Sequence, residues 1–221
     1  MGSEIRREIV ERVLARRGRL HLFDKLDAKR TALLVIDMQN AFVAPGAPIE
    51  VPAARAIVAP INRLAAALRK RGVPVIWVMH QNKKDGKDWA DFFETFVAPG
   101  KREQAAGALE AGSKLHALWP ELEAAPEDQR VPKNRYSAFI KGDFHEKLKQ
   151  RGIDTLLIAG TKTNVCCEST ARDAMMLDFK VVLLSDCTAA LSDDEQRATL
   201  ENVIQQFGDV RTADEALAML G

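Results

Sequence analysis

The sequence lacks an apolar run long enough to cross a membrane, since none of its apolar segments reaches the roughly 18 residues that a membrane-spanning helix needs. It also lacks an excess of charge of either sign: 32 lysines and arginines face 31 aspartates and glutamates, for a net charge of +1. A chain without a broad basic surface has no general attraction for nucleic acid or for an anionic membrane. We therefore expect neither as a partner, and a small molecule instead.

Cysteine is scarce as well. The three cysteines, Cys166, Cys167 and Cys187, cannot all pair internally, and the adjacent Cys166 and Cys167 are poorly placed to bridge each other without strain. The first residues, Met1 to Glu8, lack the apolar core of a secretory signal. Both features predict a soluble protein that keeps its thiols reduced in the cytoplasm.

No internal repeat, low-complexity tract or linker divides the chain, so its 221 residues, 47% of them hydrophobic, predict one domain with one substantial core. Ahead of that domain, the segment from Ser3 to Arg17 has apolar residues at helical spacing among many charges, which predicts an amphipathic helix. We divide the chain into an N-terminal helical extension, residues 1–30, and a domain of residues 31–221. We expect the helix to pack on this domain or on a neighbouring subunit.

Strand and helix patterns alternate through the domain. The run from Thr31 to Asp37 is continuously apolar and rich in β-branched residues, as is typical of a strand buried on both faces. Further strands are predicted at residues 73–79, 130–133, 155–160, 180–185 and 209–212, and helices at residues 53–71, 144–151, 167–176, 193–207 and 213–220. This alternation predicts an α/β fold with a mainly parallel sheet of five or six strands, covered by helices on both faces.

The segment from His80 to Gln129 has the weakest pattern. Its aromatic residues suggest a short helix or a lid, whose rings either line a pocket or pack on one another; the spacing on one face favours packing. These residues are Trp89, Phe92, Phe93 and Phe96.

Three reactive side chains follow predicted strands. Asp37 and Lys133 end two of them, and Cys166 lies between a third strand and a helix, where a helix N-terminus favours the thiolate. Because ligands of open α/β sheets bind beyond the carboxyl ends of the strands, we expect these side chains to converge. A carboxylate base, an ammonium and a thiolate form a covalent hydrolase centre. Taken singly, each has a structural alternative: a turn cap, a surface lysine and a small buried side chain.

Three segments carry a resemblance that joins these residues. Residues 31–42, 131–139 and 160–174 resemble the three signature segments of the isochorismatase-like cysteine hydrolases. This family includes nicotinamidases, ureidoacrylate and N-carbamoylsarcosine amidohydrolases, and isochorismatases proper. The resemblance implies a three-layer αβα sandwich and assigns the catalytic set to Asp37, Lys133 and Cys166.

The same resemblance implies details of the nucleophile turn. It places a non-proline cis peptide between Thr161 and Lys162 and an oxyanion hole made by the backbone N–H groups of Lys162 and Cys166. The Lys162 side chain then points to solvent or to an anionic substrate. The Thr-x-x-Cys spacing assigns Cys167 to packing, and Cys187 is expected to be structural.

The implied activity is hydrolysis of an amide or ureide C–N bond through a thioester, with release of ammonia or an amine. The stretches around Cys166 and Arg135 look closer to the ureidoacrylate hydrolases, which favours a carbamoyl or ureido substrate. Phe42, Arg135 and Tyr136 are candidate substrate-binding residues with an equally good structural explanation. The family also implies a homo-oligomer, a dimer or tetramer. No cofactor is expected.

A bound metal is not expected either. Nicotinamidases place an Asp and His cluster after the second strand, whereas here no second histidine follows His80 until His116. Three alternative functions remain open. An isochorismatase proper cleaves a vinyl ether without needing the cysteine, a redox or thiol sensor would use Cys166 and Cys167, and a catalytically silent relative would act through partners.

Overall fold

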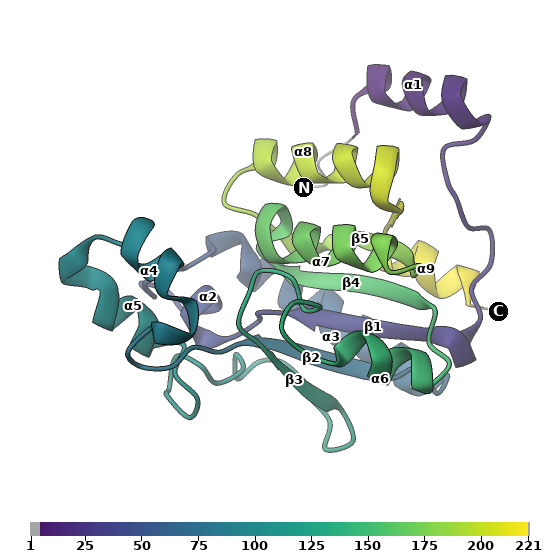
Figure 1. Cartoon of the computed structure of the whole chain (residues 1–221). Helices are drawn as coiled ribbons and strands as arrows, with labels where there is room; N and C mark the ends of the chain where they lie inside the picture. The colour runs from purple at the N-terminus through teal and green to yellow at the C-terminus, as the bar shows by residue number, and fades with distance from the viewer. Residues whose placement is uncertain (1–4, 221) are drawn as a thin grey trace.

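The computed structural model describes residues 5–220, and its central element is a parallel six-stranded sheet (Figure 1). This confirms the predicted α/β class. The strands lie in the order β3-β2-β1-β4-β5-β6. Their bounds are β1 Thr31–Ile36, β2 Val75–His80, β3 Gln129–Lys133, β4 Thr155–Thr161, β5 Lys180–Ala189 and β6 Asp209–Arg211.

The strand order reverses at the middle of the sheet. β1 pairs with β2 on one side and with β4 on the other, and every residue of β1 is buried. In sheets with this order, the chain leaves β1 and β4 toward opposite faces, which opens a crevice beyond their carboxyl ends. Asp37 follows β1 and the cysteine pair follows β4, so both flank this crevice.

Helices cover both faces of the sheet, as predicted for a three-layer fold. Alternate residues of β1 point to opposite faces: Leu33 and Val35 pack with α3 and α9, whereas Leu34 and Ile36 pack with α6, α7 and α8. Among residues 5–220, no helix is long and apolar enough to cross a membrane. The helices are α1 Arg7–Arg17, α2 Asn40–Val43, α3 Val58–Arg69, α4 Ala90–Thr95, α5 Arg102–Ala108, α6 Phe144–Gln150, α7 Glu168–Met176, α8 Asp193–Asn202 and α9 Ala213–Met219.

Helix α1 lies outside α8 in Figure 1, and it packs on its own chain. Ile9 and Val13 are buried in the core cluster of this face, and the Arg6 guanidinium pairs with Glu201 at 2.6 Å (Nη2–Oε2). The helix begins at Arg7 rather than Ser3; Ser3 and Glu4 of the predicted helix lie outside the described residues. Packing on the same domain is therefore the observed arrangement.

Two predicted helices are divided by changes in helix type. The segment predicted at residues 53–71 begins as a 3₁₀ turn, Pro52–Ile57, before α3. The segment predicted at residues 193–207 ends as a π-helical turn, Val203–Phe207, after α8. Periodicity of apolar residues locates helices but is too coarse to separate these types.

Gly160 lies at the closest approach of the two central strands. It pairs with Ile36 across β1 and β4 and has a φ of 110°, which side-chain-bearing residues rarely adopt. A Cβ atom at this position would lie 2.0 Å from the carbonyl oxygen of Ile36. Only glycine fits at position 160. Its partner on the facing strand, Ile36, is the residue immediately before Asp37.

Candidate active site

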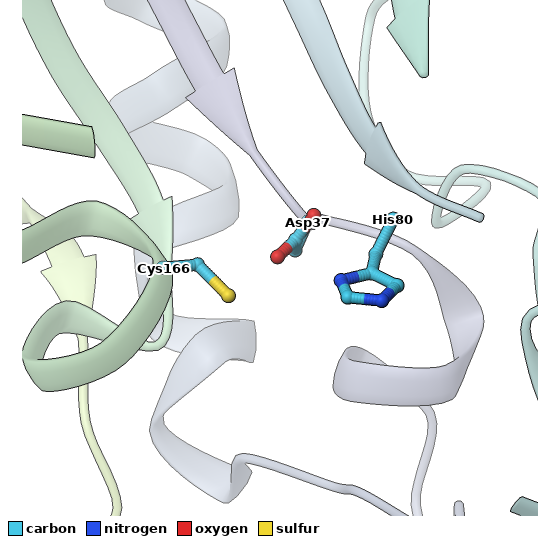
Figure 2. Close-up of side chains that lie close together, drawn as sticks. All are labelled: Asp37, His80 and Cys166. Carbon is cyan, nitrogen blue, oxygen red and sulfur yellow. The ribbon is translucent and has the colours of Figure 1, made fainter. Parts of the chain in front are cut away.

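The three predicted side chains meet at the carboxyl end of the sheet. Lys133 Nζ lies 2.8 Å from Asp37 Oδ2 and 3.5 Å from Cys166 Sγ, and all three side chains are buried. Figure 2 shows Asp37 and Cys166 pointing toward each other from neighbouring elements, with His80 beside them. The structure therefore brings the predicted residues together in one cluster.

Asp37 owes its position to an unusual backbone. Its φ of 53° turns the chain immediately after β1, a conformation that aspartate tolerates better than most residues. Its N–H still donates to the carbonyl oxygen of Val78 at 2.9 Å, which holds the turn to β2. The carboxylate is thereby directed into the crevice rather than along the strand.

Lys133 ends the edge strand β3 and extends its side chain toward the middle of the sheet. Besides Asp37 and Cys166, its ammonium donates to His80 Nδ1 and to the carbonyl oxygen of Arg135, both at 3.1 Å. A buried ammonium is stable only when it is paired and hydrogen-bonded, and this one has four such neighbours.

The nucleophile turn contains the cis peptide that the resemblance implied. The Thr161–Lys162 peptide is cis, which confirms that expectation. Cys166 lies in a π-helical turn, Thr163–Cys167, and α7 follows it. The neighbouring Cys167 is fully buried, with Sγ 3.9 Å from the carbonyl oxygen of Ala159, so the two thiols occupy different environments.

Glu168 anchors this turn to the neighbouring helix α8. Its carboxylate accepts hydrogen bonds from Thr199 Oγ1 at 2.6 Å and from Asn202 Nδ2 at 3.2 Å, and it pairs with Arg172 at 2.5 Å. The residue that follows the cysteine pair therefore fixes the start of α7, and with it the position of the thiol.

The ionisation of the thiol differs from the sequence-based expectation of a thiolate. Burial, together with the negative charge of Asp37, raises the pKa of Cys166 to about 12, although Lys133 opposes the shift. Burial also raises the pKa of Asp37, again against the opposing charge of Lys133. The direction of this pKa shift runs against the expectation because the thiol lies inside a π-helical turn beside a carboxylate, where dehydration and the carboxylate charge both disfavour the thiolate.

The centre contains two further polar residues, His80 and Gln39, that the sequence analysis did not identify. The His80 ring lies against Lys133, and the Gln39 amide holds the His80 backbone, with Nε2 donating to its carbonyl oxygen at 3.0 Å and Oε1 accepting from its N–H at 2.8 Å. Both residues come at or just after the end of a central strand, and this position was the signal that could have identified them.

Asp37, His80 and Cys166 form a group of potential metal ligands, with one ligand atom of each within 4.8 Å of the others. The Lys133 ammonium lies within 3.5 Å of an atom of each of these three residues. A divalent cation at the same point would face a positive charge in a buried site. The residues present fit an ammonium better than a metal ion.

A cavity of about 230 Å³ opens beside the thiol. The residues with polar side chains in its lining are His80, Asn82, Tyr136, Lys162 and Cys166, and the remainder of the wall is aromatic or aliphatic. A larger hollow of about 850 Å³ elsewhere on the surface is lined by none of the predicted site residues. The smaller cavity is therefore the candidate substrate site.

The predicted substrate-binding residues are placed differently from one another. Phe42 and Tyr136 both line the cavity. Arg135 does not; its guanidinium lies over the Trp89 ring, 4.6 Å from the centroid, and donates to the carbonyl oxygen of Asp88. Arg135 thus holds a wall residue in place.

The aromatic segment both packs and lines the cavity, whereas the sequence favoured packing alone. Trp89 stacks on Phe92 with centroids 4.6 Å apart and meets Tyr136 edge-on at 5.0 Å, and all three face the cavity together with Phe93. Phe96 stacks on Phe92 but is 81% exposed. Sequence spacing identified a cluster but not what it encloses.

Comparison with known proteins gives a consistent picture. The sequence profile described as the isochorismatase domain matches residues 31–215. The ureidoacrylate amidohydrolase RutB of Agrobacterium fabrum is 35% identical, over 86% of this chain and 90% of that protein. A probable inactive nicotinamidase of Arabidopsis thaliana is 34% identical over 78% of this chain and 87% of that protein. The crystal structure of a cysteine hydrolase from Pseudomonas syringae pv. phaseolicola superimposes with a TM-score of 0.83 at 31% identity, over 91% and 96% of the two chains.

Proposed function

Because this chain belongs to the isochorismatase family, we propose that it hydrolyses a C–N bond of a small ureido acid, with Cys166 as the nucleophile. The chain is an amidohydrolase of the cysteine-dependent kind. The observation that carries the assignment of residues is the buried cluster of Asp37, Lys133 and Cys166, which lies at the strand-order reversal and beside a cavity.

The first half of the reaction follows from the ionisation of this cluster. Burial raises the pKa of both Cys166 and Asp37, so the thiol rests protonated beside a carboxylate that is a stronger base than an exposed one. Asp37 takes the thiol proton as Sγ attacks the carbonyl carbon. The backbone N–H groups of Lys162 and Cys166 donate to the oxyanion that forms, and Lys133 compensates the negative charge.

The second half regenerates the thiol. As the tetrahedral intermediate collapses, the C–N bond breaks and Asp37 returns its proton to the departing nitrogen. The acyl group remains on Cys166 as a thioester, which for a ureido substrate that loses ammonia is a thiocarbamate. Asp37 then takes a proton from water, the water oxygen attacks the carbonyl carbon, and the C–S bond breaks with the proton returned to sulfur.

Three features support a ureido acid as the substrate class. Relatives that cover most of this chain are named ureidoacrylate amidohydrolases. The cavity of about 230 Å³ admits only a small molecule, and its aromatic wall suits a flat, conjugated group. Lys162 is the only residue with a permanently charged side chain in the described lining, and a substrate carboxylate would complement it.

An ammonia-release screen tests this function. The compounds are ureido acids, carbamoyl amino acids, nicotinamide and simple amides, each with the wild-type protein. We expect the highest kcat/KM for ureido or carbamoyl acids, and at least tenfold lower values for the corresponding uncharged ureas, because one charge-assisted contact contributes about 1.5–3 kcal/mol.

Mass spectrometry of the quenched protein would show the acyl group on Cys166. Preference for nicotinamide would reject the ureido class while keeping the amidohydrolase. Absence of both ammonia and a thioester with every compound would reject hydrolysis of an amide or ureide C–N bond as the activity.

We further propose that the protein is a homo-oligomer built from an N-terminal extension, residues 1–30, and a hydrolase domain, residues 31–221. Apolar side chains that remain exposed on several helices and loops support association; Leu14 is 42%, Met176 65% and Leu191 52% exposed. Light scattering is expected to give two or four times the chain mass of 24.4 kDa. A mass equal to that of a single chain at micromolar concentration would contradict the proposal.

A further inference from the structure

We propose that His80 is a positioning residue of the catalytic centre: as a neutral hydrogen-bond acceptor, its Nδ1 atom aims the Lys133 ammonium at Asp37 and Cys166. This inference rests on the proposed role of the three catalytic residues. His80 takes no part in the proton transfers or bond changes of the proposed reaction, so a positioning role is additional to the roles of those three residues.

His80 Nδ1 is one of the two acceptors that set the rotation of the Lys133 ammonium about its Cε–Nζ bond. An ammonium has three N–H groups, and four acceptor atoms surround this one. His80 Nδ1 and the carbonyl oxygen of Arg135, both at 3.1 Å, take two of the N–H groups. One N–H remains for Asp37 Oδ2 at 2.8 Å and Cys166 Sγ at 3.5 Å, the two atoms between which a proton moves.

The ring of His80 is held in the tautomer that this role needs. If Nδ1 accepts from Lys133, the proton must lie on Nε2, and Nε2 is 3.2 Å from Asn82 Oδ1. Asn134 Nδ2 donates to the same Asn82 oxygen at 3.1 Å and to Asp88 Oδ2 at 2.7 Å, which identifies the Asn82 atom as an acceptor. The chain of hydrogen bonds thus runs in one direction, from Asn134 and His80 into Asn82.

The surroundings also keep the ring neutral and still. Burial, followed by the charge of Lys133, holds the pKa of His80 well below its ordinary value, so a second proton on Nδ1 is not available to oppose the ammonium. Asp37, Lys133 and Cys166 face the ring from one side, and Arg135 and His116 add weaker effects. The Gln39 amide clamps the backbone of His80, and Trp89 stacks on its ring with centroids 6.2 Å apart.

Two substitutions separate positioning from simple packing. His80→Asn retains an acceptor atom at the δ position, where it can meet Lys133, whereas His80→Leu fills a similar space without one. The probe is iodoacetamide, with alkylation located at Cys166 by mass spectrometry, so that the result does not depend on the true substrate. In His80→Leu the ammonium loses its alignment with the thiol, and the pKa of Cys166 rises further.

We expect the alkylation rate of Cys166 at pH 8 to fall about tenfold in His80→Leu, equivalent to one pKa unit, and to stay within about threefold of wild type in His80→Asn. Imidazole ¹⁵N NMR of the wild-type protein should show a protonated Nε2 and an unprotonated Nδ1 from pH 5 to 8. The inference is overturned if Nδ1 carries the proton, or if both variants alkylate at the same rate and with the same pH dependence. Thermal unfolding of both variants checks that the fold is retained.

Discussion

Ammonia release is expected to fall by about 10⁴-fold or more in Cys166→Ala, whereas Cys167→Ala should retain turnover within about threefold of wild type. The two thiols are adjacent in sequence, yet only Cys166 contacts the charged cluster, with Lys133 Nζ 3.5 Å from its sulfur. Cys167 is directed toward the carbonyl oxygen of Ala159 and lines no part of the cavity. Loss of the Cys167 sulfur removes packing and costs about 1 kcal/mol of stability.

This pair of variants is its own control, because both replace a buried cysteine by alanine. Steady-state ammonia release with the best compound of the screen gives turnover, and chemical denaturation gives the free energy of unfolding. If Cys167→Ala lost turnover while Cys166→Ala remained active, the nucleophile would be Cys167 and the assignment to Cys166 would be wrong. Equal activity of both variants would remove the covalent mechanism and favour the vinyl ether chemistry of isochorismatases proper.

Asp37→Asn is expected to uncouple reactivity of the thiol from catalysis. Turnover should fall about 10³-fold or more because no group remains to move the proton between sulfur, the departing nitrogen and water. At the same time, Cys166 should react faster with iodoacetamide at pH 8, by about tenfold. Asparagine tolerates the φ of 53° at this position, so the turn after β1 is preserved.

The sign of the second effect follows from the causes of the shift. Burial comes first and the charge of Asp37 second among the causes that raise the pKa of Cys166 to about 12, whereas Lys133 lowers it. Removal of the carboxylate charge leaves Lys133 unopposed, so the pKa of the thiol falls and the thiolate fraction at pH 8 rises. The ratio of the alkylation rates of the variant and the wild type, measured at the same pH between 7 and 10, gives the shift of this pKa.

The double variant Asp37→Asn, Cys166→Ala should not be alkylated, which shows that Cys166 is the thiol that reacts. If instead Asp37→Asn left the alkylation rate unchanged or lowered it, the carboxylate would not be the partner of the thiol. Retention of turnover in Asp37→Asn would exclude Asp37 as the base.

The sequence predicted those parts of the site that depend on strand ends. Apolar runs with β-branched residues identify buried strands, and parallel strands end at the same edge of a sheet, so Asp37, Lys133 and Cys166 were expected to converge; the family resemblance then assigned them the catalytic roles. The predicted strands agree with the sheet to within one or two residues at most ends, although β5 continues four residues beyond the predicted Ser185.

Long-range hydrogen bonds were beyond the reach of sequence patterns. The role of His80 depends on Lys133, which is 53 residues away, and on a bond to Gln39 across the sheet. The raised pKa of Cys166 also escaped prediction, because it reflects burial and a carboxylate rather than position on a helix. The aromatic segment was ambiguous because the spacing of its rings along the chain does not reveal whether one side of the cluster faces a cavity or other side chains.

The glycine at position 160 gives the catalytic distance its structural origin. β1 leads directly into Asp37, and β4 leads into the turn that carries Cys166; the backbones of the two strands touch at Ile36 and Gly160. A methyl group at position 160 would force β1 and β4 apart at this point. The separation would then extend to Asp37 and Cys166, which follow these strands. The distance over which a proton moves between the Cys166 sulfur and the Asp37 carboxylate therefore depends on the absence of a Cβ atom at position 160.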